Sequence, residues 1–542
     1  MKLATPGYHP FRTATPSGAE AASGAWRRLG VAVALAACMV LPGCGVGLPA
    51  LPDRQASTHI MAGSDSPLGQ AYRPPSGHNG HDGVALLSDP TQALASRVLL
   101  ARAAQKALDV QVYIWEPDVS GHVLLHELWS ASQRGVRVRL LIDDNGSAGT
   151  DTWLQALAAQ TGVEVRLFNP FRQRKFKALA YLTDFDRLNH RMHNKSFTAD
   201  SQATIVGGRN VGDVYYGVNA NVLFSDLDLL AMGPAAQTTA IQFDEYWNSP
   251  LAYPLTALVA PADPADLARH QQQLADLGNM PEAALLLAGL QKSPWLTAPV
   301  TAYPLLLWAP VQVLSDSPDK AGGSAPTASA DRRVFKSLSA WLGAAKQTLD
   351  LVSPYFVPGD ASVQQLSALV QKGVTVRVVT NSLAATDVLA VHAGYARHRK
   401  ALLAAGVELY ELKPDAETRR PKLPSSVRLG ASSTASLHGK TFVVDRRQLF
   451  VGSFNLDPRS TYLNTEMGLI VDSEAMAQSL AQGIDRELQD TSYRLTLAAD
   501  GSLQWTERDA SGERVHASEP KSSLLRRLIA RVLSWLPIEG ML

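Results

Sequence analysis

The chain repeats one pattern of reactive residue types at two places far apart in the sequence. In each copy a histidine and a lysine stand two residues apart, an aspartate and a glycine follow, and an asparagine closes the pattern. The copies are His193, Lys195, Asp200, Gly207 and Asn210, and His438, Lys440, Asp445, Gly452 and Asn455, at identical spacing. Chance does not readily reproduce five positions twice, so the repeat predicts two segments that share one function.

These residue types suit a bound phosphate group. An ammonium and a carboxamide neutralise and hydrogen-bond phosphoryl oxygens, and an imidazole attacks phosphorus or donates a proton. The candidate phosphate ligands are Lys195, Lys440, Asn210, Asn455 and Ser453, the last standing where the first copy has Gly208. Asp200 and Asp445 complete the catalytic pattern, but we expect them to anchor the turn after each histidine-bearing strand rather than contact phosphate.

Phosphodiester exchange requires both a nucleophile and an acid–base group. Each copy supplies one histidine, so we expect His193 and His438 to share one site. Each imidazole also needs an orienting partner. Asp226 and Glu466 are the candidates, because they follow the two histidines by 33 and 28 residues and each precedes a hydrophobic strand. We expect each carboxylate to lie beside the histidine of its own half.

Strands alternate with helices in the sequence, which predicts an α/β layered fold. Asp89 and Pro90 begin a helix that runs to about Lys106, and further elements are expected as strands at 110–115, 136–143, 163–168 and 227–232 and a helix at 124–134. The same order recurs after residue 311 at offsets of 227 to 245 residues, as in the match of VALLSD to VQVLSD. A steady offset predicts a duplicated domain.

The doubled HxKxxxxD pattern, followed by GGxN or GSxN, resembles the phospholipase D superfamily. The runs LDVQVYIWEPDVSG, RGVRVRLLIDDN, ASLHGKTFVVD and GSFNLDPRSTYLNTEMG are similar to those of bacterial cardiolipin synthases, and the resemblance covers residues 84–542. It implies two duplicated phospholipase-D-like domains, each a mixed sheet flanked by helices, with the active site between the halves. The expected parts are 1–44 leader or anchor, 45–83 flexible linker, 84–250 first domain, 251–310 helical connector, 311–490 second domain and 491–542 C-terminal extension.

The resemblance also implies the reaction. Cardiolipin would form by transfer of a phosphatidyl group to phosphatidylglycerol, with phosphatidylethanolamine as donor, through a phosphohistidine. By the family pattern His193 attacks and His438 performs acid–base work, with no metal and no cofactor. The alternatives are a phospholipase D that passes the same intermediate to water and an exported nuclease of the same fold. The shared first half-reaction does not separate transferase from hydrolase.

Composition and the two ends of the chain bear on its location. A net charge of +1 gives no polycation for nucleic acid, and the two cysteines, Cys38 and Cys44, lie near the N-terminus. A basic flank, an apolar run and the sequence LPGC predict a signal peptide with Cys44 as the lipidated residue. The alternatives are an uncleaved anchor helix and an alanine-rich soluble segment. At the other end a basic amphipathic helix over 524–536 predicts contact with the membrane surface, the alternative being a helix docked on the body.

Overall fold

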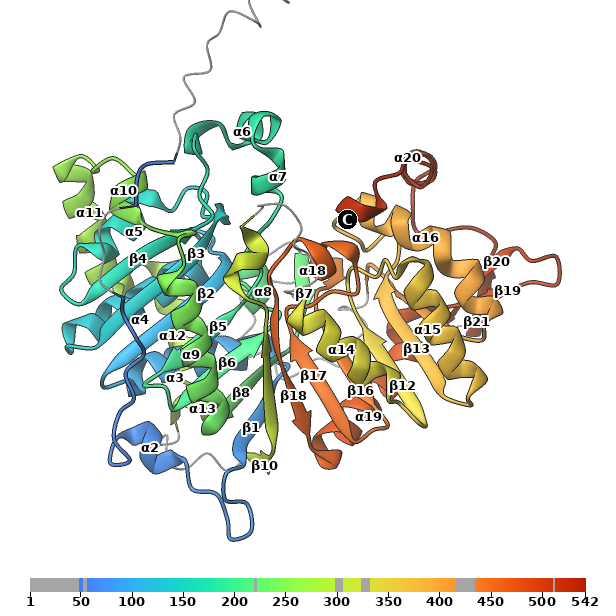
Figure 1. The fold of residues 1–542 in the computed structure, drawn as a ribbon, viewed down its shortest axis with the longest axis horizontal. Helices are drawn as coiled ribbons and strands as arrows, with labels where there is room; N and C mark the ends of the chain where they lie inside the picture. The colour runs from blue at the N-terminus through green and yellow to red at the C-terminus, as the bar shows by residue number, and fades with distance from the viewer. Residues whose placement is uncertain are drawn as a thin grey trace, which may run out of the picture. The chain divides into compact units, whose positions relative to one another are not determined.

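Two β-sheets, one in each half of the chain, position the motif segments (Figure 1). The computed structural model describes residues 48–51, 56–218, 222–297, 306–322, 332–415, 434–509 and 512–542. Ala50–Leu542 is one unit, and Met1–Pro49 is a separate one. Cys44 and the expected leader therefore lie outside the described residues.

The first sheet has the strand order β10-β1-β8-β6-β5-β2-β3-β4-β9. Strands β2, β3 and β4 run parallel to one another, and the remaining pairs are antiparallel, so the sheet is mixed. The strands are β1 (Asp82–Leu87), β2 (Ala107–Ile114), β3 (Arg137–Gly146), β4 (Val163–Phe168), β5 (Ser196–Ala199), β6 (Ala203–Gly207), β8 (Asp228–Met232), β9 (Ala252–Pro254) and β10 (Leu307–Ala309).

The second sheet has the order β11-β18-β17-β16-β12-β13-β14-β19-β20-β21. Its first seven strands follow one another as β1-β8-β6-β5-β2-β3-β4 do in the first sheet, which confirms the duplication. Three strands continue this sheet past residue 490, where we expected a separate extension. The strands are β11 (Val311–Ser315), β12 (Thr348–Val352), β13 (Thr375–Asn381), β14 (Glu408–Leu412), β16 (Thr441–Val444), β17 (Gln448–Gly452), β18 (Met467–Asp472), β19 (Ser492–Leu497), β20 (Leu503–Asp509) and β21 (Gly512–His516).

Helices cover both sheets. The Asp89 side chain caps α3 as expected, and Asp263 caps α11 in the connector. Connector residues Leu274, Leu286 and Leu290 pack into the core of the first half. The helices are α2 (Pro67–Ala71), α3 (Pro90–Ala103), α4 (Val119–Gln133), α5 (Asp151–Ala158), α6 (Lys177–Thr183), α7 (Phe185–Leu188), α8 (Asp213–Tyr216), α9 (Pro234–Asn248), α10 (Leu255–Leu258), α11 (Pro264–Ala275), α12 (Pro281–Leu290), α13 (Pro294–Thr297), α14 (Arg333–Gly343), α15 (Gly359–Gln371), α16 (Leu389–Ala404), α18 (Pro458–Tyr462), α19 (Glu474–Thr491) and α20 (Leu524–Leu533).

The two halves share a hydrophobic core. Val206 and Leu229 of the first sheet belong to the same buried cluster as Leu449 and Leu469 of the second. A short parallel sheet also joins the halves, because β7 (Val222–Ser225) pairs with β15 (Thr434–Leu437). Apolar burial at this interface therefore fixes the position of the segments around one motif relative to those around the other.

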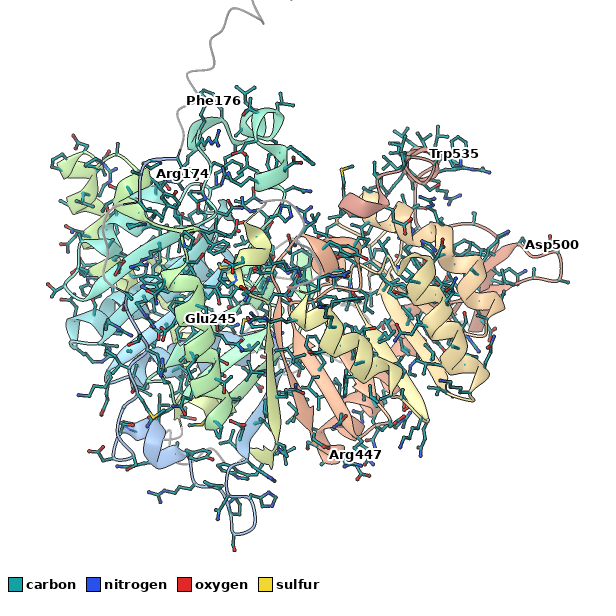
Figure 2. The ribbon with its side chains drawn as sticks, viewed as in Figure 1. Arg174, Phe176, Glu245, Arg447, Asp500 and Trp535 are labelled. Carbon is teal, nitrogen blue, oxygen red and sulfur yellow. The ribbon has the colours of Figure 1, made fainter. Side chains whose placement is uncertain are left out.

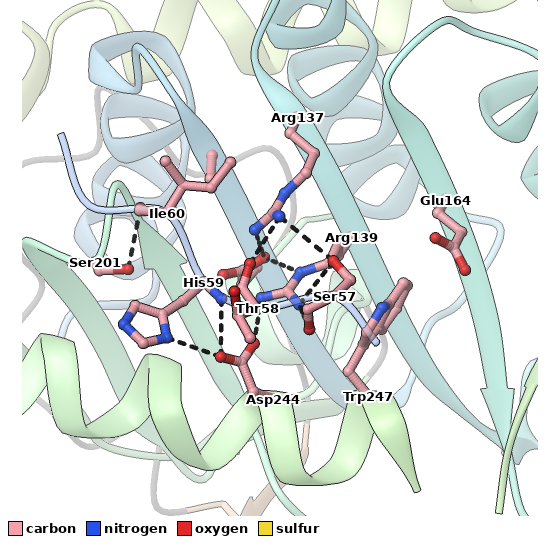
Figure 3. Close-up of polar contacts among 12 residues, drawn as sticks. Ser57, Thr58, His59, Ile60, Arg137, Arg139, Glu164, Ser201, Asp244 and Trp247 are labelled. Atoms are coloured by element: carbon pink, nitrogen blue, oxygen red, sulfur yellow. Dashed lines mark hydrogen bonds and ion pairs between the residues drawn. The ribbon is translucent and has the colours of Figure 1, made fainter. Parts of the chain in front are cut away.

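The stretch expected as a flexible linker is bound to the first half where the structure describes it (Figure 3). The Ser57 carbonyl accepts a hydrogen bond from Arg139 at 2.8 Å, and the His59 amide donates to Asp244 at 2.8 Å. Buried Arg139 also contacts Asp109 at 2.6 Å and Asp244 at 2.7 Å. A buried cation requires such partners, and the expectation of a tether is therefore wrong for this segment.

The C-terminal helix α20 carries its apolar stripe on the outside. Leu524 is 81% exposed and Trp535, just beyond the helix, is 74% exposed (Figure 2). On its other side Arg526 donates to the carbonyls of Leu383 and Thr386 at 2.8 and 2.7 Å. The helix thus rests on the body through a polar contact. Within the described ranges, no helix combines the length and apolarity needed to cross a membrane.

Candidate active site

Two buried histidine–carboxylate pairs form the centre of the site, and each joins the two halves. His193 Nδ1 lies 2.9 Å from Glu466 Oε2, and His438 Nδ1 lies 2.6 Å from Asp226 Oδ2. The expectation that each carboxylate serves the histidine of its own half is therefore wrong. Each half supplies a histidine to one pair and an acid to the other.

Backbone pairing explains the exchange. The first motif pairs with the second half, since the His193 amide donates to the Thr465 carbonyl at 2.9 Å. Glu466 follows directly and is thereby placed beside His193. In the same way the His438 amide donates to the Ser225 carbonyl at 2.8 Å, at the end of the β7–β15 pair, and Asp226 follows. The motif histidines and lysines lie just before β5 and β16 rather than in the strands.

Glu466 is held by hydroxyl groups. Ser453 Oγ donates to its carboxylate at 2.5 Å, and Ser460 Oγ donates at 2.8 Å. The Ser453 hydroxyl also accepts from the Met467 amide at 3.0 Å. We predicted Ser453 as a phosphate ligand, but its hydrogen is committed to Glu466. Ser453 therefore contacts Glu466, the carboxylate that orients His193.

Asp226 has a different environment because the first motif has Gly208 where the second has Ser453. A Cβ atom on Gly208 would lie 2.1 Å from Asp226 Oδ1, so only glycine leaves room for this carboxylate. Burial would raise the pKa of Asp226, but the hydrogen bond from His438 and the charges of Lys440 and Arg209 hold that pKa well below its usual range. Asp226 therefore stays ionised at neutral pH.

The two site lysines are fully enclosed. Lys195 Nζ donates to the His193 carbonyl at 2.6 Å, and Lys440 Nζ donates to the His438 carbonyl. Lys440 Nζ also lies 3.1 Å from His438 Nδ1. His438 Nδ1 can donate its hydrogen to Asp226 or accept one from the Lys440 ammonium, but it cannot do both. We interpret the contact with Asp226 as the hydrogen bond.

Burial sets the protonation states. It lowers the pKa of His193 well below the usual value, and Lys195 and Lys440 lower it further by repulsion. Burial likewise lowers the pKa of His438, followed by repulsion from Lys440. It raises the pKa of Glu466 to about 7 and lowers that of Lys195 to about 7, although the two charges oppose both shifts. Both histidines are thus neutral in the free protein, as a nucleophile or base requires.

The asparagines lie at the same centre. Asn210 accepts from the Ile114 amide at 3.2 Å and donates to the Tyr215 hydroxyl at 2.9 Å, which leaves one of its two amide hydrogens for a ligand. Asn455 is buried, and within the described part of the chain its Oδ1 has no hydrogen-bond partner. Both remain predicted phosphate ligands.

The motif aspartates lie in turns away from this centre, as we expected. Asp200 is fully buried and accepts from the amides of Lys106 and Ala107 at 2.7 and 2.9 Å. Asp445 does the same for Gln347 and Thr348 at 2.7 and 3.1 Å. Each occupies the left-handed region, with φ of 54° and 53°, at the first position of a tight hairpin turn. Their carboxylates contact backbone and not the histidines.

Sequence reasoning missed the aromatic side chains at the site. The Tyr113 ring lies 5.1 Å from the His193 ring, and the Tyr215 ring lies 5.3 Å from the His438 ring. The Phe224 ring lies 5.0 Å from His438. They exclude water and contribute to the burial that shifts the site pKa values. The only sequence signal was the position of Tyr113 in a run that resembles a known family.

The duplicated sheets and the doubled histidine–lysine site define a phospholipase-D-type protein. The family model described as "Cardiolipin synthase, PLD-like domain" matches residues 99–247 and 338–488. The chain is 43% identical to cardiolipin synthase C of Escherichia coli K12 over 86% of this chain and 97% of that protein. It is 32% identical to an uncharacterized protein of Helicobacter pylori 26695 over 87% of this chain and 92% of that protein.

Among solved structures, the phosphatidylserine synthase of Haemophilus influenzae Rd KW20 is similar in fold, with a TM-score of 0.50 at 14% identity. The alignment covers 85% of this chain and 95% of that one. The chain belongs to the phospholipase D superfamily and, within it, to the cardiolipin synthase family. It is a phosphatidyltransferase of that superfamily.

Proposed function

We propose that the protein forms cardiolipin by transferring a phosphatidyl group from a donor phospholipid, phosphatidylethanolamine, to phosphatidylglycerol. The observation that carries the proposal is the pair of crossed contacts, His193 with Glu466 and His438 with Asp226. Two oriented imidazoles beside two enclosed lysines supply every group that a double displacement at phosphorus needs. The relative with 43% identity, named a cardiolipin synthase, supports cardiolipin as the product.

In the first step His193 Nε2 attacks phosphorus. The Nδ1–H donates to Glu466, so the Nε2 lone pair is free. A bond forms between that nitrogen and phosphorus, and the bond to the donor's alcohol oxygen breaks. His438 gives this oxygen a proton from Nε2, which it takes up from solvent once the anionic phosphate is bound beside it. Lys195 and Lys440 neutralise the charge that develops on the phosphoryl oxygens.

In the second step the hydroxyl of phosphatidylglycerol attacks the phosphohistidine. His438, now neutral, accepts the hydroxyl proton, the new phosphorus–oxygen bond forms, and the bond to His193 breaks. Water would give phosphatidic acid by the same step. The difference between a synthase and a hydrolase therefore depends on which acceptor enters the site.

Membrane association is supported by two exposed apolar groups. One is the outer stripe of α20 with Trp535, and the other surrounds α6, where Phe176 is 67% and Leu182 is 81% exposed (Figure 2). Exposed apolar side chains on a basic helix are typical of interfacial binding. We further propose export and lipidation at Cys44, and Cys44→Ala should leave a precursor that incorporates no fatty acid.

Lipid analysis tests the function. The purified protein is incubated with labelled phosphatidylglycerol in vesicles, with and without phosphatidylethanolamine, and the products are separated by mass. We expect labelled cardiolipin whose yield rises when phosphatidylethanolamine is present, together with free ethanolamine. If phosphatidic acid is the only product, whether it comes from the labelled or the unlabelled lipid, the protein is a hydrolase instead.

A further inference from the structure

The surroundings of the two histidines differ in charge. Burial lowers the pKa of His193, and several cations, Arg459 among them, lower it further. On the His438 side, burial raises the pKa of Tyr215, and the carboxylates of Asp226, Asp387 and Glu116 raise it further. Tyr215 packs against the His438 ring. The pseudo-symmetric site is thus more cationic beside one imidazole and more anionic beside the other.

Asp387 is the new feature on the anionic side. It lies between the end of β13 and the start of α16, and its side chain is exposed. The Tyr355 hydroxyl donates to Asp387 Oδ2 at 2.6 Å, which fixes the carboxylate in place. Burial lowers the pKa of Lys440, and the charges of Asp226, Glu466 and Asp387 oppose that shift. Asn381, the last residue of β13, donates to the Leu437 carbonyl and accepts from the Leu437 amide, both at 2.9 Å. The segment that carries Asp387 therefore begins beside His438, and the exposed carboxylate is accessible to a ligand there.

The first half has a neutral tyrosine pair beside His193. Tyr113 is at the end of β2, as Tyr355 follows β12, and its hydroxyl accepts from Asn145 Nδ2 at 3.1 Å at the end of β3. The two pairs are alike in chemistry but not in position, because the bridges Trp115–Val211 and Phe356–Leu456 align Tyr355 with Ile114. Asp387 also lies beyond the end of β13, in the segment before α16. The partner is an uncharged amide in the first half and a carboxylate in the second.

We propose that Asp387, held by Tyr355, binds the ammonium group of an amine-bearing phosphodiester and so directs its alcohol toward His438. The inference rests on the proposed function and names the donor that the site selects. A zwitterionic head group offers a phosphate to the buried lysines and a cation to Asp387. A glycerol head group offers no cation, so the carboxylate favours the amine as the group that leaves.

This orientation of the head group determines which histidine is the nucleophile and which is the acid. With the amine-bearing alcohol beside His438, that histidine donates the proton to the departing oxygen, and the bond from phosphorus to His193 Nε2 forms on the opposite side. Displacement at phosphorus places nucleophile and leaving group roughly in line. The charge difference therefore supports the same assignment of nucleophile that the family pattern implies.

The test uses soluble short-chain diesters, so that membrane binding does not enter. The full chain is given dihexanoyl phosphatidylethanolamine, its N-acetylated form or dihexanoyl phosphatidylglycerol, and kcat/KM is measured from head-group release. Asp387→Asn should lower the ratio of kcat/KM for the amine to that for the glycerol diester by about two- to fivefold, the share of an ion pair at an exposed carboxylate. Tyr355→Phe should lower this ratio less, and mainly through KM.

Asp500→Asn is the matched control, because it removes the same charge from a fully exposed turn between β19 and β20 (Figure 2). It should keep the wild-type ratio. An unchanged ratio in Asp387→Asn, or equal wild-type rates on the amine and its N-acetylated form, would overturn the proposal. The ratio reports on head-group release, so it decides this point even if the phosphatidyl group passes to water and the synthase function fails.

Discussion

Glu466 of the second half accepts a hydrogen bond from Nδ1 of His193 in the first half, at 2.9 Å and out of contact with solvent. The contact spans 273 residues of sequence. Its reciprocal, Asp226 with His438, spans 212. Neither half therefore contains a complete catalytic pair, and the shared core of the two sheets is a condition for activity as well as for stability.

The pH dependence of kcat/KM should report Glu466. Burial raises the pKa of this carboxyl to about 7, so below that pH it is protonated. A protonated carboxyl donates to Nδ1 and leaves the hydrogen on Nε2, where the lone pair is needed. We expect kcat/KM to rise with pH as Glu466 ionises near pH 7, and to fall again as Lys195, whose pKa burial lowers to about 7, loses its charge.

Glu466→Gln should lose about two to four orders of magnitude in kcat, as expected when a histidine loses its orienting carboxylate. Its residual activity should lack the acidic limb near pH 7. Ser460→Ala is the matched control, because it removes one donor to the carboxylate and should move that limb to higher pH. An identical acidic limb in Glu466→Gln would assign the titration to another group.

Asp200 should matter for stability and not for chemistry. Asp200→Ala leaves backbone amides without their acceptor, among them those of Lys106 and Ala107, and should lower the free energy of unfolding by about 2–4 kcal/mol. Asp200→Asn keeps one acceptor and tolerates the left-handed φ, so its loss should be smaller. Chemical denaturation measures both, and kcat per folded molecule should stay at the wild-type value. A large fall in that kcat with normal stability would place Asp200 in the reaction.

The α20 stripe should mediate vesicle binding. Leu528 is 59% and Val532 is 45% exposed, so Glu at these positions introduces charge without opening a core. Vesicle sedimentation of Leu528→Glu/Val532→Glu should show weaker binding, while turnover of a soluble short-chain diester stays normal. Arg531→Glu alters the polar face of the same helix and should weaken binding only to anionic vesicles. Unchanged binding of the double variant to every vesicle would exclude α20 from the membrane contact.

Local patterns predicted much of the fold. Strand β4 has the predicted bounds, Val163–Phe168, because an apolar run between turn signals is a local property. The doubled motif likewise predicted a shared site, and the structure brings both histidines and both lysines together. The turn role of Asp200 followed from its place after the motif strand.

Long-range contacts were beyond the sequence pattern. The exchange of Glu466 and Asp226 between the histidines depends on pairing of the segment before β5 with Thr465, and of β7 with β15. Nothing in either segment alone encodes its partner. Ser453 was misassigned for the same reason. The pairing of β17 with β18 brings it beside Glu466, and the motif alone does not encode that pairing. The segment around Ser57 has a linker-like composition, and it is bound through long-range contacts with Arg139 and Asp244 that its own sequence does not encode.

The central claim is that His193 carries the phosphatidyl group and that His438 moves the protons. Rapid acid-free quenching with a radiolabelled short-chain diester, followed by peptide mapping, locates the phosphorus. The account predicts acid-labile, base-stable label on the peptide with His193, none in His193→Ala, and in His438→Ala a rate lower by about two to four orders of magnitude that p-nitrophenol as leaving group partly restores. Label on the peptide with His438 and none on that with His193 would contradict it.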